Sequence, residues 1–419
     1  MNFIDNSPVS KPVRAFVFII GLFLLWGVAS NLNFILLSDF GFIFQINSLQ
    51  LGLIQVVFYA GYFVASLPAS KIIELYDYKT GIIIGLLLYG VGSFLFFPAT
   101  DLFLYNLFLF ALFIIAVGLS FLETSTNPFV LSLGSPQSAI LRLNIAQSFN
   151  PIGFFFSMVI TQFFAEYLRV MPQPTEQLAY QPIYLTSVAH SVLLPFLIVG
   201  IIAIIWALLI FLLKFPIQPE EVSEPRNDKN AFQLIKAHPL LRYAILAQFF
   251  YMGAQVGIWN FIPEYATELG HPSTPINEYL IYAFVTFLIG RFLSSLLMLF
   301  FPPSKLLAIY AFISALISVA AVLVGGYSAL VLIVALNFFM SLMFPTIFGL
   351  GLSGIQPAMK KGSALIVMGM IGGAVLASLM KQLNPSTGLL FTLIIPCLSF
   401  LVIFGFASRV NILAQKSTM

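Results

Sequence analysis

The feature that most constrains this chain is a series of long apolar segments. Twelve stretches of roughly 20 residues carry few charges and are separated by polar or Pro- and Gly-containing breaks. A helix that crosses the hydrocarbon core of a bilayer needs about 20 mostly apolar residues, and in lipid only helices and closed barrels satisfy every backbone polar group. The sequence therefore predicts an all-α, twelve-helix transmembrane bundle. The predicted segments are 15–37, 49–70, 80–100, 102–130, 142–167, 188–213, 241–266, 279–301, 305–325, 328–355, 363–382 and 387–408.

Composition excludes several classes of protein. Of the 419 residues, 60% are hydrophobic and only 8% are charged, whereas a soluble domain is about 25% charged. The sequence has no Gly-rich phosphate loop and no nucleophile elbow, and its three histidines and single cysteine lie far apart. We therefore expect no enzyme activity, no ATP-driven pumping, and no metal or cofactor. The net charge of +3 comes from loop residues and does not indicate a nucleic-acid partner.

The chain divides into two similar halves. A polar stretch follows the sixth segment, which predicts a half at 1–215, a linker at 216–240 and a second half at 241–419. The run FYAGYFVASL at 58–67 shares five of its ten residues with FLIGRFLSSL at 287–296, in the second helix of each half. In transporters built from such repeats, the substrate binds near the midplane between the halves, which rock around it.

Positive charge predicts the orientation. With the N-terminus inside, 15 of the 18 Lys and Arg residues fall on the cytoplasmic side, and only Arg169 and Lys381 fall outside. Short cytoplasmic loops collect Lys and Arg, so we expect both termini in the cytoplasm. Arg291 is assigned to the inner half of its helix, with its side chain extended to the cytoplasmic interface.

Glu123 is the only acidic residue inside a predicted membrane segment. An ionisable side chain there is by default a candidate functional group. Loss of hydration favours the protonated carboxyl, so Glu123 is a candidate proton carrier. The alternative is a structural carboxylate, satisfied by neighbouring Ser and Thr or paired with Arg142 at the start of the next segment.

Carboxamides and tryptophans form a second candidate set. Amides both donate and accept hydrogen bonds, as binding of sugar hydroxyls requires, and a Trp ring can cover the apolar face of a sugar. Gln147 and Asn150 are three residues apart and share a helix face. The alternative is that the amides only join helices. With Glu123, the predicted substrate-binding set is Trp26, Asn31, Glu123, Gln147, Asn150, Gln255, Trp259 and Asn260.

Five motifs extend this interpretation. They are FLLWGVASNLN at 23–33, GLSFLETSTNPF at 118–129, RLNIAQSFN at 142–150, AQFFYMGAQ at 247–255 and FPTIF at 344–348. On these motifs the sequence resembles the fucose–proton symporter family of the major facilitator superfamily over nearly its whole length. The resemblance implies a sugar as substrate and a proton as coupling ion. It gives Glu123 the role of the family's helix-4 carboxylate, and Asn31, Gln147 and Asn150 polar roles in the cavity.

Two positions depart from the family. Phe34 follows Asn33 where the family has an acidic residue tied to proton coupling, and Phe344 replaces a tyrosine. Asp39, five residues beyond Phe34, is too near the helix end to take its place. The leading hypothesis is a monomeric, proton-coupled importer of L-fucose or a related hexose in a bacterial inner membrane. The alternatives are an uncoupled sugar facilitator and a transporter-like sugar sensor.

Overall fold

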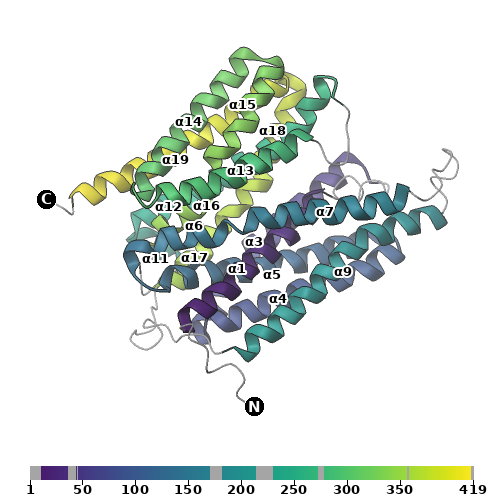
Figure 1. Ribbon diagram of the computed structural model, residues 1–419, viewed down its shortest axis with the longest axis horizontal. Helices are drawn as coiled ribbons and strands as arrows, with labels where there is room; N and C mark the ends of the chain where they lie inside the picture. The colour runs from purple at the N-terminus through teal and green to yellow at the C-terminus, as the bar shows by residue number, and fades with distance from the viewer. Residues whose placement is uncertain are drawn as a thin grey trace.

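The computed structural model describes residues 11–35, 44, 46–169, 182–213, 230–271, 278–355 and 358–416 (Figure 1). Within these ranges the secondary structure is entirely helical. Eleven helical segments are long and apolar enough to cross a membrane, and a shorter apolar stretch, Ala15–Val28, lies in the first helix. The predicted all-α bundle is thereby confirmed, since each of the twelve apolar segments coincides with one of these helices.

The N-terminal half contains the first six segments. The fifth is divided at Ser148–Phe149, because Pro151 has no N–H to donate to the carbonyl four residues earlier. The helices are α1 (Lys11–Ile35), α3 (Ser48–Leu75), α4 (Tyr78–Asp101), α5 (Tyr105–Ser132), α6 (Ala139–Gln147), α7 (Asn150–Arg169) and α9 (Pro182–Leu212), with the 3₁₀ turn η1 (Pro136–Ser138) before α6.

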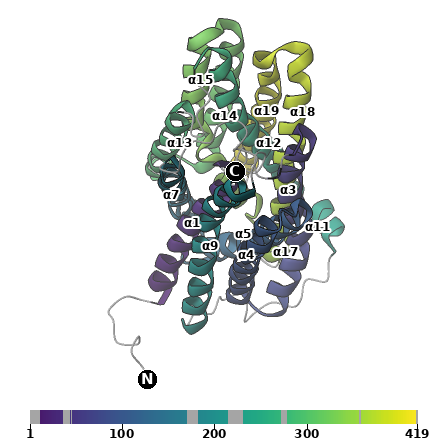
Figure 2. The ribbon, with the colours of Figure 1, turned by 90° about the vertical axis from the view of Figure 1, so that its right-hand side faces the viewer.

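The C-terminal half has a similar plan, but here the proline break lies in the fourth segment, just before Pro345. Its helices are α12 (Pro239–Glu268), α13 (Glu278–Leu297), α14 (Pro303–Val324), α15 (Gly326–Met340), α16 (Met343–Gly351), α17 (Met359–Met368), α18 (Gly372–Thr387) and α19 (Ile394–Lys416), with 3₁₀ turns η3 (Gly369–Ile371) and η4 (Leu389–Leu393). Figure 2 shows α14, α15, α18 and α19 of this half above α4, α5 and α9 of the N-terminal half, with α17 lower down beside α5.

The stretch predicted as a polar linker contains a short helix, α11 (Ala231–Ala237). A capping box begins it: the Asn230 side chain accepts from the backbone N–H of Gln233, and the Gln233 side chain accepts from that of Asn230. Leu234 is fully buried, and α11 contacts α12 and α17. The described part of the linker is thus packed against the C-terminal half.

Close helix contact places the site residues of the N-terminal half. Where α1 meets α7, a Cβ on Gly27 would collide with the backbone carbonyl of Asn150, and one on Gly153 would collide with the α1 backbone at Leu24 and Val28. Only glycine permits the two backbones to approach this closely. The contact brings Trp26 and Asn31 of α1 beside Asn150 of α7.

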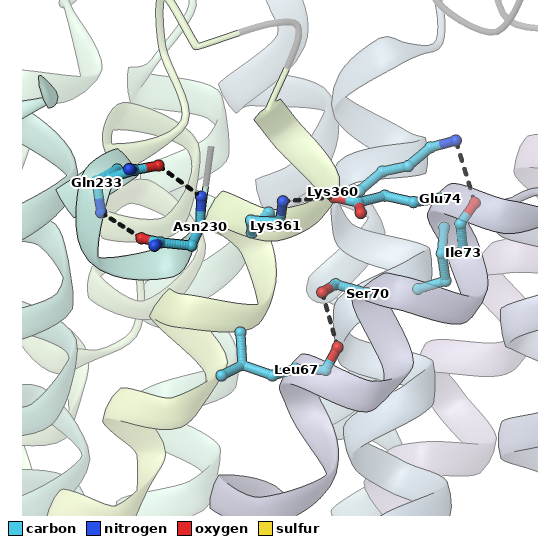
Figure 3. Close-up of polar contacts among 8 residues, drawn as sticks. All are labelled: Leu67, Ser70, Ile73, Glu74, Asn230, Gln233, Lys360 and Lys361. Carbon is cyan, nitrogen blue, oxygen red and sulfur yellow. Dashed lines mark hydrogen bonds and ion pairs between the residues drawn. The ribbon is translucent and has the colours of Figure 1, made fainter. Parts of the chain in front are cut away.

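The two halves meet at the end of the bundle where α1 begins and α19 finishes, here the terminal end. Lys360 donates to the carbonyl of Ile73 at 3.2 Å, and Lys361 lies 3.7 Å from the Glu74 carboxylate (Figure 3). Deeper in the interface, Ser363 donates to the carbonyl of Thr124 at 3.1 Å. Toward the opposite, distal end, the helices of the two halves diverge (Figure 1). The bundle is therefore sealed at its terminal end.

Candidate functional site

A central cavity of about 140 Å³ lies between the two halves, lined by residues of both. The structure brings seven of the eight predicted substrate-binding residues to its walls. They are Trp26, Asn31, Glu123, Gln147 and Asn150 from the N-terminal half, and Gln255 and Trp259 from the C-terminal half.

A continuous series of hydrogen bonds crosses the cavity wall from one half to the other. Arg291 Nη1 donates to Gln147 Oε1 at 3.2 Å, Gln147 Nε2 donates to Asn127 Oδ1 at 2.9 Å, and Asn127 Nδ2 donates to Glu123 Oε2 at 2.6 Å. All four side chains are buried. We call these four residues the polar relay.

Arg291 sets the direction of the whole polar relay. A guanidinium group can only donate, so Gln147 must turn its oxygen toward Arg291 and its nitrogen toward Asn127. Asn127 must then offer its nitrogen to Glu123. Glu123 Oε2 therefore always receives a donor, and Oε1, which has no hydrogen-bond partner among the described residues, is the oxygen free to carry a proton or meet a ligand.

The side-chain direction predicted for Arg291 is wrong. Its side chain does not extend to an interface but is 4% exposed and lies in the cavity wall, with the guanidinium 5.0 Å from the centre of the Phe287 ring. Arg291 Nη1 also donates to the Gln147 backbone carbonyl at 3.3 Å. That carbonyl is available because Pro151, four residues on, has no N–H to give it.

Arg142 is not the partner of Glu123. Its guanidinium instead donates to the carbonyls of Val130, Leu131 and Ser135, at 2.9–3.2 Å, and to the Ser138 hydroxyl at 2.7 Å. It thus satisfies the free carbonyls at the end of α5. The structural alternative that paired these two residues is excluded by this geometry.

The remaining predicted residues are partly engaged within the protein. Asn31 Nδ2 donates to the carbonyl of Gly27 at 2.5 Å, and Asn150 Nδ2 to that of Phe23 at 3.4 Å, so each keeps its amide oxygen for another donor. Trp26 stacks on Phe23. Trp259 Nε1 donates to Asn337 Oδ1 at 3.0 Å, which fixes the indole ring against the cavity.

The sequence interpretation omitted several cavity residues. Tyr59, Tyr251 and Phe344 line the cavity, and the Tyr251 hydroxyl and Arg291 Nε are buried without a hydrogen-bond partner among the described residues. Buried polar atoms normally have partners, so these two donors suit a polar ligand. Aromatic residues are so frequent in this chain that no pattern marks Tyr59 or Tyr251 as a cavity residue, and Phe344 stands out only as a departure from the family motif.

Asn260 lies elsewhere. It lines a second cavity of about 230 Å³ on the distal side, here the distal cavity, formed by α3, α12, α18 and η4. Gln55 of α3 lines both cavities, so the two are neighbours. Phe34 lies in α1, but its side chain is outside the described residues, as is Asp39.

In the described part of the chain, no group of three or more His, Cys, Asp or Glu residues could hold a metal ion. The central cavity offers hydrogen-bond donors, acceptors and aromatic faces around a small space. Such a site suits binding of a compact polar molecule.

Comparison with known proteins gives consistent results. Residues 18–379 match the sequence model of the Major Facilitator Superfamily. The L-fucose-proton symporter of Escherichia coli (strain K12) is 39% identical, with 96% of this chain and 94% of that protein covered. The Glucose/galactose transporter of Brucella abortus (strain 2308) is 30% identical, with 92% and 91% covered.

Solved structures agree with these relatives. A crystal structure of a Major Facilitator Superfamily transporter, FucP, in the outward conformation is similar with a TM-score of 0.86 and 38% identity, covering 96% of this chain and 99% of that one. The proton:xylose symporter XylE bound to 6-bromo-6-deoxy-D-glucose shares the fold at 14% identity, with a TM-score of 0.75 and 95% of each chain covered.

Proposed function

This chain belongs to the major facilitator superfamily and, within it, to the family of the L-fucose–proton symporters, and on that premise we propose that it imports a monosaccharide together with a proton. It is a multi-pass membrane transporter and not an enzyme. The substrate we propose is L-fucose or a related hexose. We further propose that it works as a monomer in a bacterial inner membrane, with both termini in the cytoplasm, the terminal end facing inward and the distal end facing outward.

The observation that carries this proposal is the polar relay. It joins Glu123 in the N-terminal half, the only acidic residue among the described residues of the cavity wall, to Arg291 in the C-terminal half. A sugar in the cavity would meet the free donors of Tyr251 and Arg291 and the free acceptors of Glu123, Asn31 and Asn150. Trp26 and Trp259 would cover its apolar face.

Glu123 would couple the proton to the sugar. A charged carboxylate in a sealed, dry cavity is costly, and protonation removes that cost. The occluded state through which the halves rock is therefore favoured when Glu123 is protonated and its neighbours are satisfied by sugar. One charge moved across the membrane supplies about 2.3 kcal/mol per 100 mV, which sustains a sugar gradient of roughly fifty-fold.

The test is uptake of labelled L-fucose into proteoliposomes, with and without an inward proton gradient. We expect accumulation above equilibrium only with the gradient, and faster uptake as the external pH falls, because the protonated fraction of Glu123 then rises. In Glu123→Gln, gradient-driven accumulation and the pH dependence should both be lost, while exchange of labelled for unlabelled sugar continues.

Glu268→Gln is the matched control, since Glu268 is an exposed carboxylate at the end of α12 that lines neither cavity. It should accumulate sugar as the unsubstituted protein does. If Glu123→Gln still accumulated L-fucose with the gradient, Glu123 would not be the proton carrier. If L-fucose and D-galactose both failed to exchange across the membrane, sugar transport itself would be contradicted.

One observation favours a second function, an uncoupled sugar facilitator. Phe34 stands where the family has its helix-1 acid, so one of two expected proton-binding groups is missing. In that case the unsubstituted protein would equilibrate L-fucose across the membrane, and the proton gradient would not raise its final level.

A further inference from the structure

We propose that the distal cavity is a second sugar-binding site, which holds a monosaccharide before it enters the central cavity. This inference rests on the proposed function, because it concerns the same substrate. It starts from the position of Asn260, whose amide faces not the central cavity but this larger space of about 230 Å³.

The polar groups of the distal cavity are available to a ligand. Among the described residues, the side chains of Gln55, Asn260 and Lys381 have no hydrogen-bond or ion-pair partner, although all three line the cavity. They could have been satisfied by one another or by neighbouring carbonyls, as Asn127 and Gln147 satisfy each other in the polar relay. Two amides and one ammonium group therefore remain to donate to hydroxyl oxygens, and the amides also accept from hydroxyl protons.

One carboxylate on this wall is held in place. Asn384 Nδ2 of α18 donates to Glu264 Oε1 of α12 at 2.9 Å, and both residues line the cavity. The bond fixes one oxygen of Glu264 and leaves Oε2 as an acceptor of known orientation. Preorganised charged acceptors make stronger hydrogen bonds than neutral ones, and a carboxylate can accept from two adjacent hydroxyls.

An apolar surface completes the site. Phe261 lines the cavity, 2% exposed, together with Met380 and Leu389. Small-molecule sites combine a mainly apolar wall with a few convergent polar groups. The distal cavity has this composition, and its donors, acceptors and aromatic ring are of the same kinds as those of the central cavity.

The two cavities are neighbours, because Gln55 lines both. At Gly52, one turn earlier on α3, a Cβ would meet no atom within 4 Å, so the distal cavity is open along this face of α3. A sugar held by Asn260 and Glu264 would therefore lie next to the central cavity. Gln55 could form a hydrogen bond with the sugar in either cavity.

The test separates binding in the distal cavity from binding in the central one. Ser378, which lines the distal cavity, is replaced by Cys in a Cys397→Ser background, and its reaction with an impermeant maleimide is measured in proteoliposomes with and without L-fucose. The same measurement is repeated with Gln147→Ala, which disables the central cavity. We expect L-fucose to slow labelling in both backgrounds.

Matched substitutions identify the residues involved. With Gln147→Ala present, Glu264→Gln or Asn260→Ala should raise the L-fucose concentration for half-protection about three- to tenfold, the effect of losing one or two hydrogen bonds. Glu268→Gln, a carboxylate one turn further along α12 that does not line the cavity, should leave it unchanged.

Each other outcome overturns the inference. Protection that disappears with Gln147→Ala would mean that the reporter senses only central occupancy. Absence of protection in both backgrounds, while the protein still exchanges L-fucose, would mean that the distal cavity is only a water-filled entrance. If neither L-fucose nor D-galactose is exchanged, the proposed function fails, and this inference fails with it.

Discussion

At the scale of single residues, Arg291 has more consequence than its sequence position suggests. Its charge orients Gln147, Asn127 and finally Glu123, and it does so with no acidic partner among the described residues within ion-pair distance. Hydropathy places a residue along a helix but says little about which neighbour its side chain meets. The sequence therefore predicted Glu123 and most of the amides, but not the residue that connects them to the other half.

Arg291→Lys tests this orienting role. Lysine keeps the charge but is shorter than arginine and lacks its planar guanidinium, so its ammonium would not occupy the place from which Nη1 donates to the Gln147 amide and backbone carbonyl. We expect the Kd for L-fucose, measured by calorimetry on the purified protein, to rise about tenfold or more. Arg409→Lys, an exposed arginine whose Nη1 donates to the Tyr243 hydroxyl at the terminal end, should leave the Kd unchanged.

Asn260 was predicted to line the central cavity but lines the distal cavity instead. Gln255 and Trp259 are four residues apart and share a face of α12, so a prediction that includes one includes the other. Asn260 is one residue further, about 100° around the helix. That rotation directs it to the distal cavity, and no sequence pattern revealed that a second cavity was there.

Gln248→Leu tests how much a buried amide without hydrogen bonds lowers the stability of the protein. Gln248 is fully buried in α12, and neither its nitrogen nor its oxygen has a hydrogen-bond partner among the described residues. Gln248→Leu removes two unsatisfied groups at similar volume, so we expect stability to rise by about 1–3 kcal/mol and the Tm in detergent to increase.

The matched comparison is Asn337→Leu. The Asn337 amide accepts from Trp259 Nε1 and donates to the carbonyl of Ile333 at 2.9 Å, so Asn337→Leu removes the acceptor that Asn337 gives to the buried indole N–H. The Tm should fall. Equal falls in both variants would mean that Gln248 is satisfied in the folded protein.

At the scale of the helix, prolines turn two membrane segments into pairs of shorter helices. The sequence predicted single helices at 142–167 and 328–355, whereas each is broken three or four residues before a proline. The apolar pattern continues through a break, so hydropathy cannot detect it. In the fifth segment the break has a function, because it provides the carbonyl that Arg291 binds.

Pro151→Ala tests that function. Alanine restores an N–H that can donate to the Gln147 carbonyl, so the helical bond would compete with Arg291 Nη1 for this acceptor. We expect a higher Tm, because the helix becomes continuous, together with a several-fold loss of L-fucose exchange in proteoliposomes. Pro98→Ala, at the distal end of α4 and outside the cavity, should not reduce exchange. A Pro151→Ala protein with unchanged exchange would show that the break is structural only.

At the scale of the whole molecule, the two halves are joined at the terminal end and diverge at the distal end. The sequence predicted the two halves and their twelve helices, but not this state. The same apolar helix faces would be buried whether the terminal end or the distal end is sealed. Composition therefore does not predict which end is closed. The contacts of α17 with α3 and α5 favour the sealed terminal end.

Lys360→Ala should shift this balance. Lys360 binds the carbonyl of Ile73 in the last turn of α3 and lies 5.0 Å from the centre of the Tyr78 ring, so it joins the halves by a helix-end contact and a cation–π contact. We expect the population with an open terminal end to increase about three- to tenfold. The measurement is the distance distribution between spin labels at Tyr76→Cys and Phe232→Cys, both of which replace exposed side chains.

Lys305→Ala is the control, since Lys305 is an exposed lysine at the terminal end that stays within the C-terminal half. Its distance distribution should match that of the unsubstituted protein. An unchanged distribution in Lys360→Ala would mean that the apolar contacts of α17 alone keep the terminal end sealed.

The common wall of the central and distal cavities at Gln55 has a pharmacological consequence. Two neighbouring cavities leave room for a sugar in one and for an appendage in the other. A glycoside carrying a flexible aromatic tail would seat its sugar ring in the central cavity, while the tail occupied the distal cavity. With the tail wedged between α3 and α18, the halves could not close behind the sugar. Such a compound would compete with the natural substrate without being carried, and its potency would grow with the fit of the tail.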